Sequence, residues 1–193
     1  MRKSVITTEE KNKWWNGTLF EDDVVELAIG KAYRDLMRTI RGFASNKNNN
    51  VIKTNARESI KKYIDYIVEC NMNQELFDKL HREQCYKLIE IFGEQEFTIG
   101  QAQKWINMTF KNLHLLEYSK IDAVYEYCHI PIDSYMLSIT KYSKLNTSWS
   151  KLDNYDDYLE YQKWFREKYN DEIPLDKEFY LWLEESEKRS KLM

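Results

Sequence analysis

The chain has 193 residues, a net charge of −3 and an aromatic content of 15%, but only 5 glycines and 2 prolines. So few turn-forming residues exclude a many-stranded sandwich or barrel. The abundance of Leu, Ile, Val and Phe excludes a disordered chain. The composition predicts a compact single all-α domain spanning residues 1–193.

Helix signals follow one another along the first half of the chain. An acidic triplet at 21–23 precedes apolar residues at helical spacing from Val24 to Ile40, and Gly42 ends this pattern. The stretch 45–50 reads SNKNNN, which is typical of a polar loop. Two further helices are expected, one from an Asn55 cap to Val68 and one from Asn73 to Gly93.

The second half continues the pattern. A long amphipathic helix is expected over 98–116, and Pro131 opens a shorter one that runs to Ile139. Other elements are expected as follows: a helix over 119–127, a loop over 145–154, a helix over 155–169, and a last helix from an Asp176 cap that frays over 184–191. This gives about eight helices and no convincing strand.

The small net charge hides an uneven distribution. Residues 31–62 carry a charge of +7, whereas the residues from Lys120 onward carry −4. The overall acidity disfavours a protein that binds nucleic acid by charge alone, but the basic segment leaves room for a local basic face. Two solvated helix faces are the alternative interpretation.

Several other classes of protein find no support. No apolar run has the length of a membrane span, and residues 7–13 are polar where a signal peptide is apolar, so a cytoplasmic location is expected. Three cysteines without a C-x-x-C pair fit that location. Zinc could in principle be bound by His81, Cys85, Cys128 and His129, but two of these residues are adjacent and free cysteines are commonly buried, so no metal is expected.

The most informative stretch runs from Phe97 to Asp133. Ile99-Gly100 forms a tight entry into the helix over 98–116, and Lys104 lies on that helix away from its apolar stripe. Asp133 follows Pro131 by two residues, in the first turn of the next helix, where the helix dipole favours a carboxylate.

This pattern resembles the helix-hairpin-helix DNA glycosylase superfamily, in which a hydrophobic-Gly turn leads to a catalytic Lys and a later P-[VI]-D element supplies a catalytic Asp. The 29 residues from Lys104 to Asp133 are most similar to the archaeal 8-oxoguanine DNA glycosylase branch. The resemblance implies a helix-hairpin-helix-like element, Lys104 as amine nucleophile and Asp133 as its carboxylate partner. It implies base excision from duplex DNA with a flipped base, with or without AP-lyase activity, by a monomer without a cofactor.

Further contacts are expected from the same resemblance and from the charge pattern. DNA would be contacted by Gly100, Gln101, Lys111, Arg38, Arg41, Lys53 and Arg57. The flipped base would lie against aromatic rings, for which Trp105, Trp149 and Trp164 are the candidates. The base itself, which could be an oxidised guanine, an alkylated purine or a modified viral base, and the choice between DNA repair and antiviral defence stay open.

Plainer interpretations compete with this one. A Lys opposite an apolar stripe is usually only solvated, and Pro-x-Asp usually only begins a helix; Ile173-Pro174-Leu175-Asp176 repeats that pattern without a Lys motif. The alternative is a non-enzymatic α-helical protein that binds another macromolecule through its aromatic surface. It predicts a broad exposed aromatic patch and no pocket between Lys104 and Asp133. If the two side chains point to different surfaces, their pairing in the motif is accidental.

Overall fold

The computed structural model describes residues 23–145 and 147–190. The prediction of an all-α protein is confirmed, because those residues form α-helices and short 3-10 helices and no strand. The α-helices are α2 (Val24–Leu36), α3 (Asn49–Ile67), α4 (Gln74–Phe92), α5 (Ile99–Leu115), α6 (Ser134–Thr140), α7 (Tyr155–Lys168) and α8 (Pro174–Ser190). The 3-10 helices are η1 (Met37–Thr39), η2 (Phe43–Ser45), η3 (Ser119–Ala123), η4 (Tyr125–Tyr127) and η5 (Trp149–Lys151).

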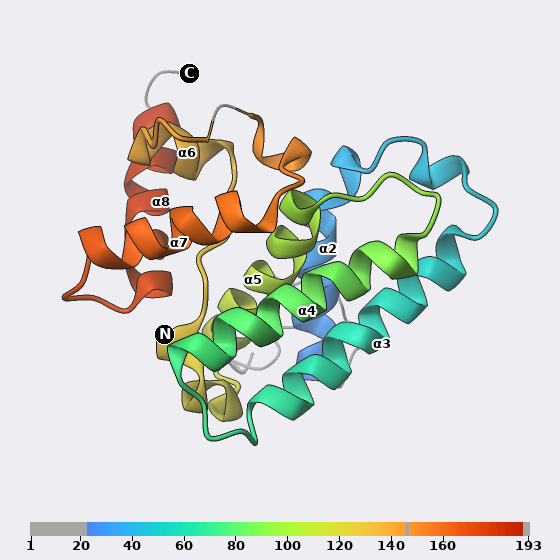
Figure 1. Ribbon diagram of the computed structural model, residues 1–193, viewed down its shortest axis with the longest axis horizontal. Coiled ribbons are helices and arrows are strands. Elements are labelled where there is room, and N and C mark those ends of the chain that lie inside the picture. Colours follow the sequence, from blue (N-terminus) through green and yellow to red (C-terminus); the bar gives the residue numbers. More distant parts are fainter. Residues whose placement is uncertain (1–22, 146, 191–193) are drawn as a thin grey trace, which may run out of the picture.

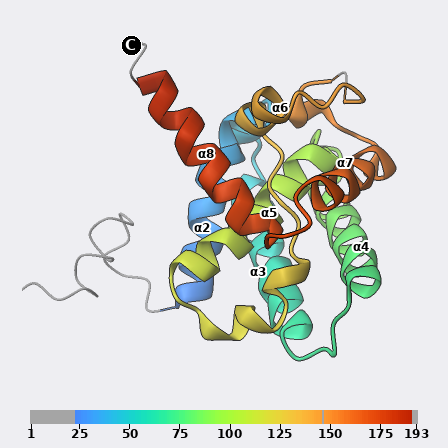
Figure 2. The ribbon, with the colours of Figure 1, turned by 90° about the vertical axis from the view of Figure 1, so that its left-hand side faces the viewer.

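The centre of the molecule is α5. Fourteen of its 17 residues are buried, and the other helices surround it. Helices α3 and α4 lie side by side (Figure 1), and the view at 90° places α2 and α8 on one side of α5 and α4 and α7 on the other (Figure 2). A helix that is buried nearly all round must satisfy its polar side chains internally, and this requirement shapes the candidate site.

Side-chain caps fix several helix starts as expected. Asp23 accepts hydrogen bonds from the first turn of α2, and Asn73 accepts one from the Leu76 N–H in α4. Thr98 and Gln101 cap α5 reciprocally. Gly93 ends α4 with a φ of 58°, a backbone conformation that favours glycine. Residues 21 and 22, and the segment weighed as a signal peptide, lie outside the described residues.

Several element boundaries differ from the prediction. The helix expected to open at Pro131 begins at Ser134, and Asp133 is its cap, because Oδ1 of Asp133 accepts the Met136 N–H. Helix α2 ends at Leu36 and continues as η1. Helix α3 begins at Asn49, because asparagines are tolerated in an exposed first turn and Asn46 Oδ1 accepts the Asn48 N–H in the turn before it. Residues 119–127 form two 3-10 turns. Helix α8 begins at Pro174, whose fixed φ suits a first helical position, and runs to Ser190. Asp176 does not cap it; it accepts a hydrogen bond from Tyr125 at 2.7 Å.

Gly100 brings a distant loop against the start of α5. A Cβ atom at this position would lie 1.7 Å from the Trp149 carbonyl oxygen, and the Gly100 N–H donates to the Leu152 carbonyl at 2.8 Å. Glycine is required here for close backbone packing, and its φ is not positive.

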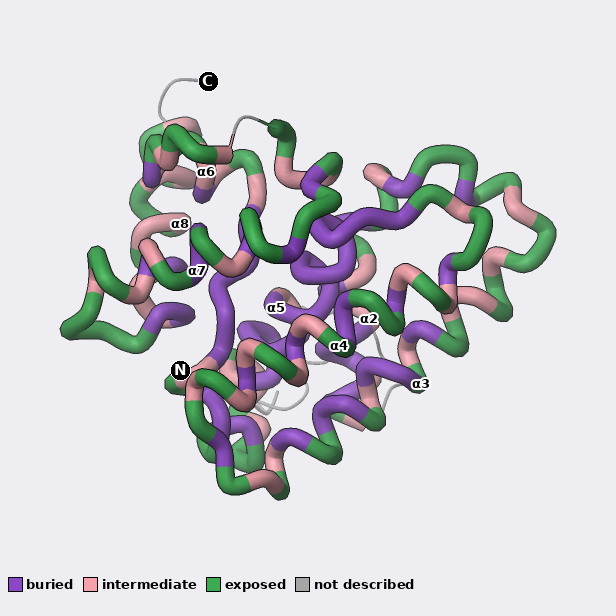
Figure 3. Tube along the Cα trace, in the orientation of Figure 1, coloured by how far each residue is buried: buried purple, intermediate pink, exposed green. Residues whose placement is uncertain are grey.

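A buried stretch of irregular backbone precedes α6. Residues 128–132 are buried along their length, as the tube in Figure 3 shows. Buried loops are rare because their backbone polar groups need partners, so the partners of this segment are part of the site described next. Among the described residues, no helix is long and apolar enough to cross a membrane.

Candidate functional site

Lys104 and Asp133 form a buried pair. The Lys104 ammonium donates to Asp133 Oδ2 at 2.8 Å, and the two side chains are only 7% and 14% exposed. The other oxygen, Oδ1, accepts the Met136 N–H at 2.9 Å and so caps α6. Because each carboxylate oxygen has its own partner, the helix start holds Asp133 in a fixed orientation toward the lysine.

Two glutamines hold the backbone that carries Asp133. Gln103 accepts the Ile132 N–H at 3.1 Å and donates to the Ile132 carbonyl at 2.9 Å. Gln162 on α7 bonds Ile130 in the same two-way manner, at 3.0 and 2.9 Å. These side chains replace the strand partner that an extended buried segment would otherwise need. Gln103 adjoins Lys104 and Ile132 adjoins Asp133, so this clamp sets the distance within the pair.

The pair opens into a cavity of about 710 Å³ between α2, α5, α6 and α8. Four aromatic side chains line it: Tyr135, Trp149, Phe179 and Trp182. Four basic side chains also line it: Lys31, Arg38, Lys104 and Lys111. Cavities with apolar walls and a few convergent polar groups are the usual places for ligands.

A second buried ion pair lies in the same cavity. Lys111 donates to Glu178 Oε2 at 2.6 Å, with Glu178 only 1% exposed. The Lys111 ammonium also lies over the rings of Phe179 and Trp182, at 5.4 and 5.8 Å from their centroids. Burial raises the pKa of the Glu178 carboxyl, and its Oε1 is buried without a hydrogen-bond partner. This oxygen is a candidate acceptor for a ligand N–H.

The residues expected to contact DNA lie in different environments, and only some of them are accessible. Arg38 lines the cavity and Arg41 is exposed, whereas Lys53 is half-buried on α3. Arg57 is bonded to Glu26 on α2, with Nη2 at 2.8 Å. The loop 149–152 covers Gly100, and Lys111 is committed to its buried ion pair.

Gln101 also faces the protein. Its amide donates to Thr39 and its carbonyl accepts the Thr98 N–H. The contacts expected of Gly100 and Gln101 with DNA therefore have no geometric basis, since both groups are used in folding the start of α5.

Of the three tryptophans proposed for a base pocket, only one lies at the cavity. Trp149 lines the cavity. Trp105 is fully buried, where its indole N–H donates to the Ile29 carbonyl at 3.1 Å, and Trp164 packs against Tyr142 and Tyr161 away from the cavity. Neither ring lines the cavity, because Trp105 is part of the core and Trp164 packs against residues that are not in the cavity wall.

The sequence reasoning missed the aromatic wall contributed by α6 and α8. Tyr135 and Trp182 stack with their centroids 5.7 Å apart, and Phe179 lies one turn before Trp182. The i, i+3 spacing of Phe179 and Trp182 was the available signal, since such residues share one helix face. Gln103 was missed too; its signal was the run of uncharged amides within an apolar helix.

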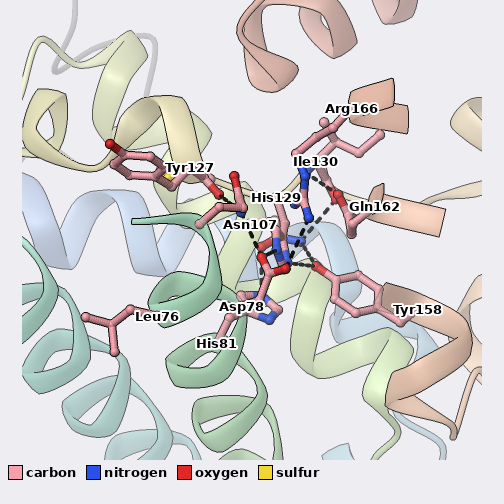
Figure 4. Close-up of polar contacts among 12 residues, drawn as sticks. Leu76, Asp78, His81, Asn107, Tyr127, His129, Ile130, Tyr158, Gln162 and Arg166 are labelled. Carbon is pink, nitrogen blue, oxygen red and sulfur yellow. Dashed lines mark hydrogen bonds and ion pairs between the residues drawn. The ribbon is translucent and has the colours of Figure 1, made fainter. Parts of the chain in front are cut away.

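A buried polar network joins side chains of α4, α5 and α7 to the irregular segment before α6 (Figure 4). His129 contacts Asp78 and Tyr158, both at 2.8 Å, and His81 contacts Asn107 and Tyr155 at 2.9 and 2.8 Å. Burial lowers the pKa of both imidazoles. These contacts use all four ring nitrogens of the two histidines in hydrogen bonds.

The described residues hold no group of three or more His, Cys, Asp or Glu side chains arranged to bind a metal ion. Cys85 and Cys128 are fully buried, and burial raises the pKa of both thiols well above the ordinary value.

No protein-family model matches the chain, and neither the curated proteins nor the solved structures contain a significant match to it.

Proposed function

We propose that this protein is a DNA glycosylase in which Lys104 is the amine nucleophile and Asp133 its carboxylate partner. One observation carries the proposal: the Lys104 ammonium and the Asp133 carboxylate meet at 2.8 Å in an aromatic-walled cavity. The non-enzymatic alternative expects no pocket between these two residues. The helix-hairpin-helix assignment is part of the same proposal, with α4, the turn that follows it and α5 as the hairpin.

The chemistry uses the pair in a defined order. Asp133 takes a proton from the Lys104 ammonium, and the freed amine bonds to C1′ of the deoxyribose. The C1′–N bond to the base breaks, and its electron pair leaves with the base, which takes up a proton. The lysine nitrogen then forms a double bond to C1′ as the sugar ring opens and O4′ is protonated. Water hydrolyses this Schiff base, or loss of a C2′ proton expels the 3′ phosphate.

The surroundings fit the demands of that reaction. The flipped base would stack on the aromatic wall formed by Tyr135, Trp149, Phe179 and Trp182. Glu178 Oε1, which has no protein partner, would accept an N–H of the base. Lys31 and Arg38 at the cavity, with exposed Arg41 beyond them, would contact phosphates.

Borohydride trapping tests the proposal. The protein is incubated with duplexes that carry oxidised, alkylated or otherwise modified bases; hydride then reduces a Schiff base to a stable adduct. We expect an adduct from at least one duplex, and none from Lys104→Gln, which keeps a donor to Asp133.

A second pair of variants tests the carboxylate. Asp133→Asn preserves the helix cap and should slow base release by about 10² or more. Asp176→Asn, in the other Ile-Pro-x-Asp sequence, is the matched control and should release base at the wild-type rate. Release of no base from any duplex, or an undiminished adduct in Lys104→Gln, would refute the proposal.

A further inference from the structure

A second hollow, of about 510 Å³, lies between α4 and α7. These two helices lie on the side of α5 opposite α2 and α8 (Figure 2), and the hollow shares no lining residue with the Lys104–Asp133 cavity. Four basic side chains and two acidic ones line it: Lys79, Arg82, Lys163, Arg166, Glu75 and Asp78. We call it the α4/α7 groove.

The buried acid of this groove is already fully bonded. Asp78 Oδ1 accepts from Gln74 at 2.7 Å and contacts His129 at 2.8 Å, and Oδ2 accepts from Arg166 at 3.1 Å. Burial alone would raise the pKa of Asp78, but the hydrogen bond with His129 and the charge of Arg166 outweigh it and lower the pKa to about 2. Asp78 therefore anchors Arg166 and offers no free acceptor to a cation.

Apart from the Glu75 carboxylate, the unused groups of the groove are donors. Arg166 is 19% exposed, and its Nη1 is buried without a hydrogen-bond partner. A buried donor left unpaired is costly and rare. Lys79 and Lys163 are exposed on the rim and make no ion pair with any described residue. Arg82 differs, because it pairs with Asp156 and lies over the Tyr155 ring.

We propose that the α4/α7 groove binds a phosphate group. An anchored guanidinium on the floor and two ammonium groups on the rim supply several donors from different directions, which suits an anion with several acceptor oxygens. Glu75, exposed on the rim, is the one carboxylate of the groove without a partner, and the lining charge is positive. The phosphate can be free or part of a nucleic-acid backbone, and two arms of one experiment separate these sources.

The first arm uses inorganic phosphate. The ¹⁵N side-chain signal of Arg166 is followed during a titration with sodium phosphate at constant ionic strength, with chloride as the balancing anion. We expect a saturable shift, and a Kd about tenfold weaker in the Lys79→Gln/Lys163→Gln variant. Lys62→Gln/Lys87→Gln removes the same charge from exposed positions outside the groove and should leave the Kd unchanged.

The second arm uses an undamaged single-stranded oligonucleotide and the same signal, in the Lys104→Gln background. A saturable shift assigns the site to a nucleic-acid backbone, and the slope of log Kd against log salt should then fall by about 1.4 in Lys79→Gln/Lys163→Gln. A shift with inorganic phosphate alone assigns it to free phosphate.

An Arg166 shift that never saturates, or a Kd that is equal in the groove variant and its control, would refute the proposed phosphate site. Neither arm needs base release. The result is therefore independent of whether Lys104 is a nucleophile.

Discussion

The clamp between Gln103 and Ile132 can be tested by replacing Gln103 with Leu. Leucine fills most of the glutamine volume but removes the amide. The Ile132 N–H and carbonyl would both lose the side-chain partner that they have in the wild type. Both groups are buried, because residues 128–132 and Gln103 are all buried.

The magnitude follows from the number of groups left without a partner. Each unsatisfied buried backbone group costs about 1–3 kcal/mol, so Gln103→Leu should lower the free energy of unfolding by about 2–6 kcal/mol. Gln162→Leu is the matched control. It leaves only the Ile130 N–H unpaired, because the Ile130 carbonyl keeps the Asn107 amide at 3.1 Å, and should cost about 1–3 kcal/mol.

Urea unfolding of the two variants and the wild type measures these differences, and borohydride trapping measures the effect on the pair. Adduct formation should fall further in Gln103→Leu than in Gln162→Leu, since Ile132 adjoins Asp133. If Gln103→Leu unfolds at the wild-type urea concentration, the clamp does not hold the segment. If both variants lose adduct in proportion to stability alone, Gln103 has no role in placing Asp133.

Three further predictions concern pH, the second ion pair and close packing. Burial lowers the pKa of His81 and His129, so the unfolded chain binds more protons than the folded one. The stability that the two neutral histidines contribute is complete above pH ~6.5 and falls by up to about 1.4 kcal/mol per histidine and pH unit as acid is added. Urea unfolding between pH 7 and 5 would show this loss, and a flat profile would contradict it. Glu178→Ala leaves the Lys111 ammonium uncompensated and should cost about 3–5 kcal/mol; the same loss in a Lys111→Met/Glu178→Leu protein would argue against that cause. Gly100→Ala forces a Cβ into a backbone carbonyl and should lower the Tm strongly, while an unchanged Tm would mean that the loop over 149–152 does not pack there.

Much of the fold follows from local chemistry. Asn73 and Gly93 bound α4 where the sequence places them, because a side-chain acceptor and a residue that tolerates positive φ are local requirements. The expected start at Asn55 and the Asp176 cap were wrong, since polar residues that favour helix starts are also tolerated inside a helix: Asn55 lies in the second turn of α3 and Asp176 in the first turn of α8.

The candidate site, like the fold, was predictable from the sequence in part. The motifs that carry the family resemblance marked Lys104 and Asp133, and the Pro-x-Asp pattern indicated a helix start close to Asp133, which caps α6. The sequence could not show that the two side chains meet, nor that Lys104 is only 5% exposed, because both depend on α5 being surrounded. A lysine off the apolar stripe is expected in solvent until a second layer of helices covers it.

The sequence by itself determined that the chain is helical, where most helices begin, and which lysine and aspartate to consider together. The helical pattern depends on residues a few positions apart, and the lysine and aspartate are marked by the short motifs that carry the family resemblance. Only the tertiary structure decided which aromatic rings line the cavity, that Gln103 clamps Ile132, and that α4 and α7 place four basic side chains around one groove. Those arrangements join distant segments of the chain, as Arg166 and Asp78 do across 88 positions, and no local pattern specifies which distant surfaces will pack.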